Sequence, residues 1–469
     1  MTSGPPRSDS GVLPRRDFLI AGGAVVLGGC AHTPATPVAP TTPPAPTSQP
    51  TPAPGEARIR AHRTLGRTGF EVSDIALGCG RISDPALVRY AHDRGVTFFD
   101  TAEGYGNGDS ERMIGQAMPH LRRERIFIVT KLHLEPDEGE QKILDRFGRC
   151  LDRLRTDHVD ALYMHAVTDA AMVKHAGFHG ALRKLRAAGK VRHAGISCHG
   201  PRGKGDSMER VLLAAAEDGR FDLMLMVYNF LNRAPGEKVL AACKEKNIGA
   251  TLMKVTPARL ELRPFDPDDP SEEHARLLGL AMKKGMSRPE AEAWLRERIA
   301  RQRAEIDEHR GRLDAFVARH GVKTEEQLAR LSIQWVLANP AVSTVCVSMN
   351  DFEAMDATLP LSGTRLSRAD TSRLDELAAL LSPGYCRHGC AACADACPAG
   401  VPVSTVMRYA YYFARGRERQ AMEKYAALGG EDASRCVGCE APCLGACPHG
   451  LPVPAQLLAA HHRLSLERA

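Results

Sequence analysis

Four titratable side chains stand at or just beyond the ends of apolar runs between residues 75 and 165. Asp100, Lys131 and His165 close three of these runs, and Tyr105 follows Asp100 by five residues. A carboxyl, an ammonium, an imidazole and a phenol can each hold or move a proton, so a group of this composition suits general acid–base chemistry. The elements that carry the four residues decide whether they meet.

Short apolar runs alternate with longer amphipathic ones from residue 58 to about 382, a pattern typical of βα units around a parallel sheet. Eight strands are predicted, which is the number that closes a (β/α)8 TIM barrel, an α/β fold with its active site at the carboxyl ends of the strands. A hairpin is expected at residues 66–69. The predicted strands are 75–79, 97–100, 126–131, 159–165, 191–197, 223–228, 248–255 and 342–347.

The seventh βα unit contains an insertion, roughly residues 260–321, with charged helical patterning. A solvated helical excursion is the ordinary interpretation of such a segment. The alternative is a cover over the barrel mouth or a docking surface.

Residues 98–106 (FFDTAEGYG), with Thr130-Lys131 and Tyr163-Met164-His165, resemble the signature and tetrad of the aldo-keto reductase family. Separations of 5, 26 and 34 residues along the tetrad fit the family pattern, and the resemblance covers about 300 residues. It implies an oxidoreductase that reduces a carbonyl or oxidises an alcohol.

The resemblance also implies a role for each member of the tetrad. Tyr105 would donate the proton to a carbonyl that accepts hydride, if the phenol's pKa of about 10 is lowered by a nearby ammonium. Lys131 would supply that charge, and Asp100 would keep Lys131 charged and oriented. His165 would hold the carbonyl oxygen by a hydrogen bond.

Residues that would contact a nicotinamide cofactor match the family only in part. The family has a Ser/Asn pair after the fifth strand, where this chain has Ser197 and Cys198. Leu225 stands in place of the glutamine that usually binds the carboxamide. A barrel that has lost nicotinamide binding therefore stays open as an alternative.

The segment 347–353 resembles the family's adenine-phosphate segment but contains no Lys or Arg, and Asp351 would repel a 2′-phosphate. Ser348, Asn350 and Glu353 could still bind a dinucleotide. NAD or NADP is thus expected to bind without strong preference for the 2′-phosphate, unless a cation such as Lys254 compensates.

Eight of the fourteen cysteines lie in two runs, each ending in Cys-Pro. With one extra residue, each run resembles the bacterial ferredoxin pattern, in which the fourth cysteine ligates the other cluster. We therefore expect two 4Fe-4S clusters with crossed ligation. Zinc and disulfides are the alternatives for such cysteines. The expected sets are Cys386, Cys390, Cys393 and Cys447 for one cluster, and Cys397, Cys436, Cys439 and Cys443 for the other. Between the runs, an aromatic helical stretch at 403–425 is expected to pack on the clusters or the barrel.

The N-terminus has the features of an export signal. Arg15 and Arg16 precede an apolar run of signal-peptide length, which resembles the twin-arginine signal. The run ends at Cys30 in a sequence that resembles a bacterial lipobox, so Cys30 is the expected lipidation site; an ordinary cleavage site with an incidental cysteine is the alternative. A Pro/Thr-rich tether follows.

Composition limits the remaining possibilities. With 469 residues, 43% of them apolar, the chain can bury a large core, and a net charge of +6 spread among 56 acidic residues argues against nucleic-acid binding. The expected organisation is a signal peptide at 1–30, a linker at 31–57, a TIM barrel at 58–382, and a small α-helical two-cluster ferredoxin-like domain at 383–469.

Two functions remain open at this stage. The first is an exported, periplasmic or envelope-bound, lipid-anchored oxidoreductase that acts on a small carbonyl or alcohol. Its clusters would exchange electrons with a membrane donor or acceptor. The second is a non-catalytic binding or electron-transfer barrel in which the clusters are structural.

Overall fold

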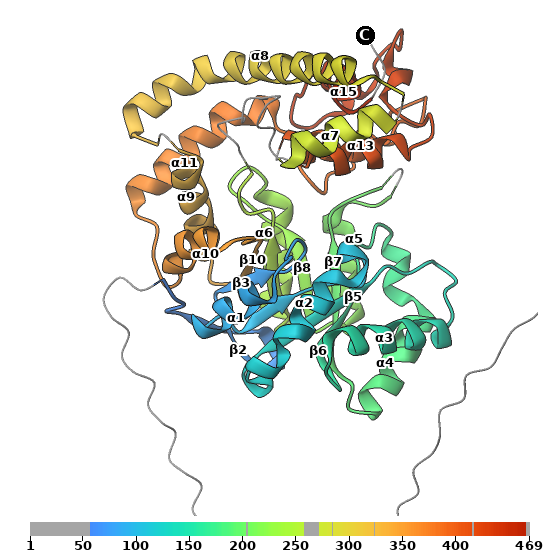
Figure 1. Ribbon diagram of the computed structural model, residues 1–469, viewed down its shortest axis with the longest axis vertical. Helices are drawn as coiled ribbons and strands as arrows, with labels where there is room; N and C mark the ends of the chain where they lie inside the picture. Colours follow the sequence, from blue (N-terminus) through green and yellow to red (C-terminus); the bar gives the residue numbers. More distant parts are fainter. Residues whose placement is uncertain are drawn as a thin grey trace, which may run out of the picture. The chain divides into compact units, whose positions relative to one another are not determined.

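The computed structural model describes residues 57–202, 205–257, 272–283, 285–322, 324–414 and 417–465 (Figure 1). The predicted signal at Arg15 and Arg16, the lipidation site Cys30 and most of the tether lie outside these residues. Among the described residues, no helix is both long and apolar enough to span a bilayer.

Eight parallel strands form a closed barrel, which confirms all eight predicted strands. In the order of the barrel, β10 pairs with β3 and β9, and the other strands pair in sequence. Every residue of β5 is buried, as expected for a parallel strand covered on both faces. The strands are β3 (Ile75–Gly78), β4 (Phe98–Asp100), β5 (Phe127–Leu132), β6 (Val159–Met164), β7 (Val191–Cys198), β8 (Leu223–Val227), β9 (Gly249–Met253) and β10 (Thr344–Val347).

The predicted hairpin is present and lies against the amino end of β9. Its strands, β1 (His62–Thr64) and β2 (Glu71–Ser73), pair antiparallel. Gly66 has a φ of +49°, and a Cβ there would lie 2.2 Å from the backbone N of Gly249. Only glycine permits this approach, so the hairpin packs closely on the end of the barrel opposite the carboxyl ends of the strands.

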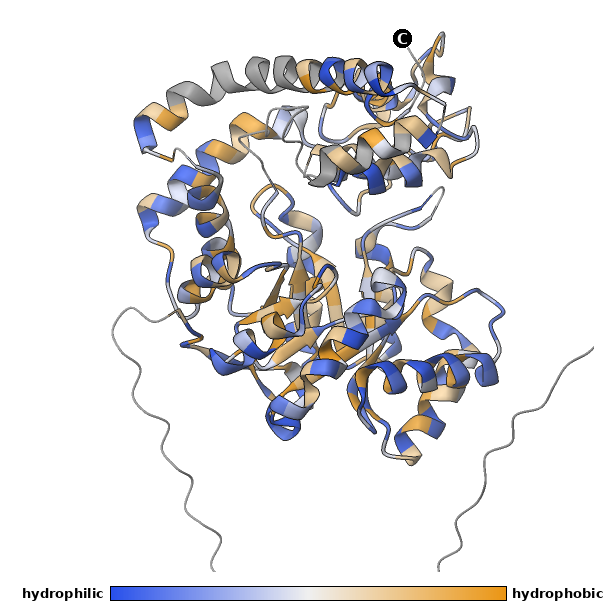
Figure 2. Cartoon of the chain, viewed as in Figure 1, coloured by the Kyte–Doolittle hydropathy of each residue, from blue (hydrophilic) through white to orange (hydrophobic). Residues whose placement is uncertain are grey.

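Helices surround the barrel, with apolar faces toward the strands and polar faces outward (Figure 2). The first helix begins at a capped end, because Asp84 accepts a hydrogen bond from Ala86 N (2.7 Å) and Pro85 occupies the first turn. The barrel helices are α1 (Pro85–Asp93), α2 (Asp109–Ala117), α3 (Glu140–Leu154), α4 (Ala176–Ala187), α5 (Met208–Asp218), α6 (Ala234–Glu245), α9 (Glu325–Leu337), α10 (Phe352–Thr358) and α11 (Arg368–Leu381).

The insertion after β9 forms α7 (Glu272–Lys283) and α8 (Arg288–His320). Its interpretation as a solvated excursion is wrong, because Leu278, Trp294 and Leu295 are buried in a core shared with the C-terminal helices. The alternative, a docking surface, describes it correctly. The partner helices are α12 (Val403–Ala414), α13 (Glu418–Ala426), α14 (Cys443–Ala446) and α15 (Val453–Leu464).

The C-terminal helices are joined to the barrel mouth. Met208 N donates to Gly389 O (2.9 Å), and Asn232 Nδ2 donates to His388 O (2.8 Å). Gly200 and Gly389 both have positive φ, and a Cβ on Gly200 would lie 2.3 Å from Gly389 Cα. As expected from its aromatic pattern, α12 packs on the barrel, where Thr405 Oγ1 donates to Pro201 O (3.2 Å).

Candidate active site

The structure brings the four predicted catalytic residues together at the carboxyl end of the barrel. Asp100 ends β4, Lys131 lies near the end of β5, and His165 follows β6. Lys131 Nζ donates to Asp100 Oδ1 (2.6 Å) and to Thr101 O (2.7 Å). Burial by itself would lower the pKa of Lys131, but Asp100 raises it, so the ammonium stays charged.

Tyr105 lies beside this ion pair, with its ring centroid 4.9 Å from Lys131 Nζ. The expected lowering of its pKa is wrong, because burial raises it to about 12 against the opposing effect of Lys131. The ammonium is already neutralised in part by Asp100, so less of its field acts on the phenol. Tyr105 therefore carries its proton throughout the neutral range.

His165 packs edge-on against Tyr105, with ring centroids 5.5 Å apart. Burial, then the charge of Lys131, lowers the pKa of His165 well below its ordinary value, so its imidazole is neutral. Its Nδ1 is buried and makes no hydrogen bond to a described residue. A neutral imidazole with an unused nitrogen can bind a carbonyl oxygen.

His133 stacks on His165 with ring centroids 4.2 Å apart, and it is not among the residues predicted from the sequence. It follows Lys131 by two residues, and the alternation of side chains along a strand could have placed it on the same face. Burial lowers the pKa of His133 to about 4. The two stacked rings are therefore both neutral.

A cavity of about 410 Å³ opens beside the tetrad. Asp100 and Tyr105 line it, and so do three of the predicted cofactor residues, Leu225, Ser348 and Asn350. The C-terminal segment closes it with a set of side chains that we call the roof: Tyr411, Tyr412, Arg417 and Gln420. Nothing in the barrel pattern indicated the roof, since it depends on how a distant segment packs.

The other predicted cofactor residues do not line this cavity. Ser197 is fully buried, and its Oγ accepts a hydrogen bond from Ala166 N (2.8 Å). Cys198 is also buried, and its sulfur accepts from Gly200 N (3.3 Å). Glu353 is exposed in the first turn of α10. Asp351 caps that helix by accepting from Ala354 N (2.7 Å), so its carboxylate has a structural partner.

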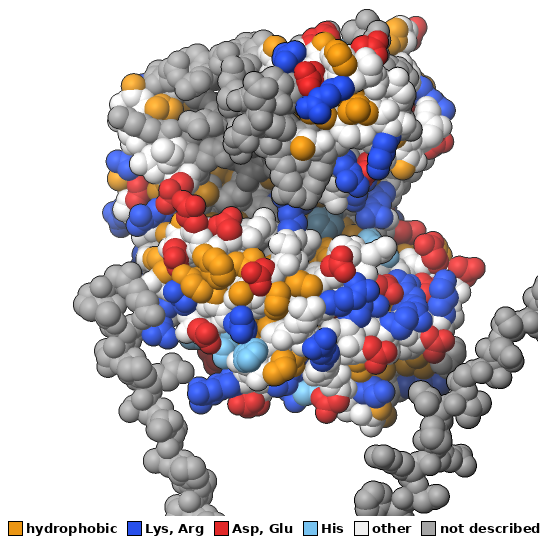
Figure 3. Space-filling view, viewed as in Figure 1, with side chains coloured by type: hydrophobic (Ala, Val, Ile, Leu, Met, Phe, Trp, Pro, Cys, Tyr) orange, Lys and Arg blue, Asp and Glu red, His pale blue; other side chains and the backbone are white. Residues whose placement is uncertain are grey.

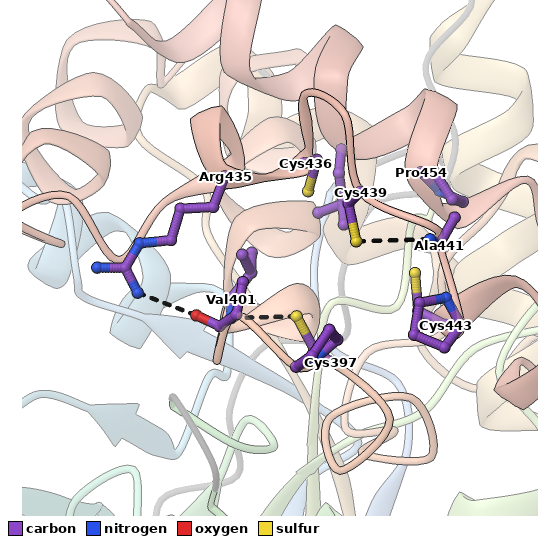
Figure 4. A pocket seen from close by; sticks show the side chains of 12 residues that line it. Cys397, Val401, Arg435, Cys436, Cys439, Ala441, Cys443 and Pro454 are labelled. Carbon is purple, nitrogen blue, oxygen red and sulfur yellow. Dashed lines mark hydrogen bonds between the residues drawn. The ribbon is translucent and has the colours of Figure 1, made fainter.

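Four cysteines from the two runs line one small pocket, shown in Figure 4. They are Cys397, Cys436, Cys439 and Cys443, the predicted crossed set. Val401 N donates to the sulfur of Cys397 (3.3 Å), and Ala441 N donates to that of Cys439 (3.4 Å). The described side chains include no group of three that could hold a single metal ion.

The remaining four cysteines also lie near one another. Burial raises the pKa of Cys386 to about 12, and the next causes are the neighbouring thiols of Cys393, Cys390 and Cys447. Three of these belong to the first run, and the fourth closes the second. The thiols that neighbour Cys386 therefore come from both runs, as they do in the predicted crossed set.

Comparison with known proteins places the barrel in a family. The model described as "Aldo/keto reductase family" matches residues 83–379, more than half of the sequence. The chain therefore belongs to the aldo/keto reductase family, a family of oxidoreductases.

Individual relatives are distant. The chain is 30% identical over 204 residues to "Probable aldo-keto reductase 1" of Glycine max, covering 39% of this chain and 56% of that protein. It is 26% identical over 372 residues to "Aldo-keto reductase AMT2" of Alternaria alternata, covering 67% and 91%. A solved aldo-keto reductase of Klebsiella pneumoniae in complex with NADPH is 21% identical, with a TM-score of 0.46 over 68% of this chain and 95% of that one.

Proposed function

We propose that the protein reduces a carbonyl group, or oxidises the corresponding alcohol, with Tyr105 as the proton donor. The observation that carries this proposal is that Tyr105 and Asp100 line one cavity, while Tyr105 also contacts Lys131 and His165. In the reducing direction, hydride forms a C–H bond at the carbonyl carbon, and the phenol proton forms the O–H bond. Both electrons come from the hydride donor.

The high pKa of Tyr105 makes it an acid that holds its proton until a stronger base appears. An alkoxide developing on the carbonyl oxygen is such a base. Lys131 would then stabilise the phenolate that remains, since its own charge is secured by Asp100. Neutral His165 would donate a hydrogen bond to the same oxygen, which fixes the position of the carbonyl.

A nicotinamide dinucleotide is the hydride donor we propose. Leu225, Ser348 and Asn350 line the same cavity as Tyr105 and would contact it. The Klebsiella pneumoniae relative was solved with NADPH. Ser197, which matches the family, and Cys198, which replaces its asparagine, are both engaged by backbone N–H groups. Leu225 replaces the glutamine, so the nicotinamide end would be held differently in this chain.

Two 4Fe-4S clusters would occupy the C-terminal segment. The four cysteines around the pocket in Figure 4 provide the thiolate ligands that a cubane would use, and its iron atoms lie at separate corners, so four ligands need not converge on one point. The N–H groups aimed at Cys397 and Cys439 suit cluster sulfurs, because such bonds tune reduction potential. When bound, clusters of this type supply one-electron transfer.

Aromatic rings connect the first cysteine run to the cavity. Tyr385 Oη lies 2.8 Å from His388 Nδ1, and the His388 ring contacts Tyr411 at a centroid distance of 4.3 Å. Tyr411 lines the cavity and donates to Thr256 O (3.3 Å). These contacts support electron exchange between the C-terminal segment and the site.

The contacts between the C-terminal segment and the barrel favour a second candidate function. In this alternative the clusters stabilise the roof and carry no electrons. The specific observation is that the first cysteine run bonds directly to the barrel, through Gly389 to Met208 and through His388 to Asn232. Dithionite reduction of the purified protein with its nucleotide bound, followed by addition of a carbonyl compound, separates the two, because electron-carrying clusters would each give one electron to restore the hydride donor. Clusters that only stabilise the roof and transfer no electrons would stay reduced.

We also propose that the protein is exported by the twin-arginine route and lipid-anchored at Cys30. Arg15→Lys with Arg16→Lys should retain it in the cytoplasm, and Cys30→Ser should leave it exported but unanchored. An unprocessed protein beginning at Met1 in the native host would contradict this assignment.

The test of the reductase proposal is Tyr105→Phe, which removes the proton donor and almost no volume. Carbonyl-dependent oxidation of NADH or NADPH should fall by about 10²- to 10⁴-fold, while the melting temperature stays unchanged. Retention of the full rate would exclude Tyr105 as the acid.

A further inference from the structure

Positive charge gathers where the roof meets the barrel mouth. Lys254 follows β9, Arg408 lies on α12, and Arg417 lies between α12 and α13. All three surround Tyr412: Lys254 Nζ is 5.1 Å and Arg417 Cζ is 5.6 Å from its ring centroid. We call these four residues the cationic chamber. Lysines, arginines and histidines are visible along the junction between the barrel and the C-terminal helices (Figure 3).

The cations of the chamber lack carboxylate partners. Among the described residues, no Asp or Glu forms an ion pair with Lys254, Arg408 or Arg417, and Lys254 Nζ is buried without a hydrogen bond. Arg408, only 5% exposed, makes long contacts to His199 O (3.4 Å) and Gly200 O (3.5 Å). Burying charge without compensation is costly, so a structure that does so is arranged for a ligand of opposite charge.

Two other partly buried cations of this protein are paired with carboxylates. Arg146 forms bidentate contacts to Glu138 and further bonds to Glu103, and Arg153 pairs with Glu111 at 2.6 Å. The absence of carboxylates in the chamber is therefore not a general property of the fold.

Burial and the positive charges of the chamber shift the pKa values of Tyr412 and of the adjacent His199. Although burial opposes it, Lys254, Arg408 and Arg417 lower the pKa of Tyr412 to about 8. His199, which lines the cavity, has a pKa well below its ordinary value because of burial and then Lys254, and its Nδ1 is buried without a described partner. Two polar atoms, Lys254 Nζ and His199 Nδ1, are thus free to bind a ligand.

We propose that the cationic chamber binds an anionic group of the substrate, a carboxylate or a phosphate monoester, while the substrate's carbonyl lies at Tyr105. This inference rests on the proposed function and specifies its substrate class. Lys254, Tyr412 and Arg417 line the same cavity as Tyr105, so one molecule can reach both places. The residues proposed for the dinucleotide come from β8 and the segment after β10, whereas the cations come from the end of β9 and the roof.

Direct binding provides the first test, because it does not require turnover. Calorimetric titration of the full, iron-loaded chain with inorganic phosphate and, separately, with acetate should detect binding of one or both, and the tighter anion identifies the class. Lys254→Met and Arg417→Gln should each weaken binding by roughly 10- to 100-fold. Lys244→Met, an exposed lysine on α6, is the matched control and should bind like the unaltered protein. Melting temperatures establish that each variant is folded.

Two results would overturn the proposal. One is unchanged anion binding in both Lys254→Met and Arg417→Gln. The other is loss of NADH binding in these variants with anion binding retained, which would assign the cations to the cofactor's pyrophosphate. If anions bind as expected but no carbonyl compound is turned over, the chamber stands and the proposed reaction fails.

Turnover provides the second test once a reaction is found. For matched aldehydes with and without a carboxylate, Lys254→Met should raise the KM of the charged substrate by roughly 10- to 100-fold and leave that of the neutral one unchanged. An equal effect on both would contradict a role in recognising the anion.

Discussion

The ammonium of Lys131 lies 2.6 Å from the carboxylate of Asp100, and both side chains are buried. Tyr105 is the third member of this arrangement. Burial raises its pKa, the charge of Lys131 lowers it, and that of Asp100 raises it. The pair therefore contributes to the stability of the fold as well as to the proposed reaction.

Removing one member of this pair should destabilise the fold as well as stop the reaction. Lys131→Met leaves Asp100 buried and unpaired, which should cost about 3–5 kcal/mol in the free energy of unfolding by urea. The double variant Lys131→Met, Asp100→Asn removes both charges and should recover much of that stability while staying inactive. Recovery of activity in the double variant would refute the role of Lys131.

Because Gly200 and Gly389 approach closely, adding a single methyl group should disrupt the contact between the barrel and the C-terminal segment. Gly200→Ala places a Cβ 2.3 Å from Gly389 Cα at a φ of +95° and should lower stability by about 1–3 kcal/mol or more. Gly450→Ala is the control, since it has a positive φ but no atom within 4 Å of the added Cβ. Amide hydrogen exchange should show faster exchange in α12 for the first variant alone.

Anion binding by the chamber should depend on pH through Lys254. Its pKa is lowered to about 8, chiefly by burial and then by Arg408 and Arg417 against the opposing effect of Tyr412. The ammonium is charged below that pH and neutral above it, so affinity for phosphate should fall as the pH rises through about 8. Calorimetry at several pH values measures this. Lys254→Arg keeps its charge and should bind with little pH dependence; a parallel decline in that variant would assign the effect to Tyr412.

Crossed ligation predicts which cysteine pairs behave as one site. Cys397→Ser should lose about half of the bound iron, and the double variant with Cys443→Ser should lose no more, because both thiols serve one cluster. The double variant Cys397→Ser, Cys393→Ser should lose nearly all of the bound iron, because each change affects a different cluster. Iron and sulfide analysis gives the answer, with Cys243→Ser, a buried barrel cysteine, as the control. The opposite pattern would mean that each run holds its own cluster.

The barrel could be predicted from the sequence because its signals are local. Apolar runs marked all eight strands, and the positions of Asp100, Lys131 and His165 at strand ends placed them on one rim. His133 was missed, although its spacing from Lys131 was sufficient to find it. The pKa of Tyr105 was predicted in the wrong direction, because spacing carries no information about the balance between burial and a shared charge.

The roof could not be predicted, because it depends on contacts between distant segments. Tyr412 and Arg417 stand more than 150 residues from Lys254, and no periodicity connects them. The charged pattern of the insertion likewise concealed Trp294 and Leu295, which are buried in a core formed with α7 and the C-terminal helices. Local composition describes a segment by itself and does not reveal what packs on it.

The shared core of α7, α8 and the C-terminal helices has a consequence for the order of folding during synthesis. Trp294 and Leu295 leave the ribosome well before Tyr425 and Leu457, their partners in that core. The barrel can close once β10 is made, but its inserted helices keep an apolar face uncovered until the last residues emerge. Burial of this shared core therefore waits until α15 has been synthesised, although the strands of the barrel are complete more than 100 residues earlier.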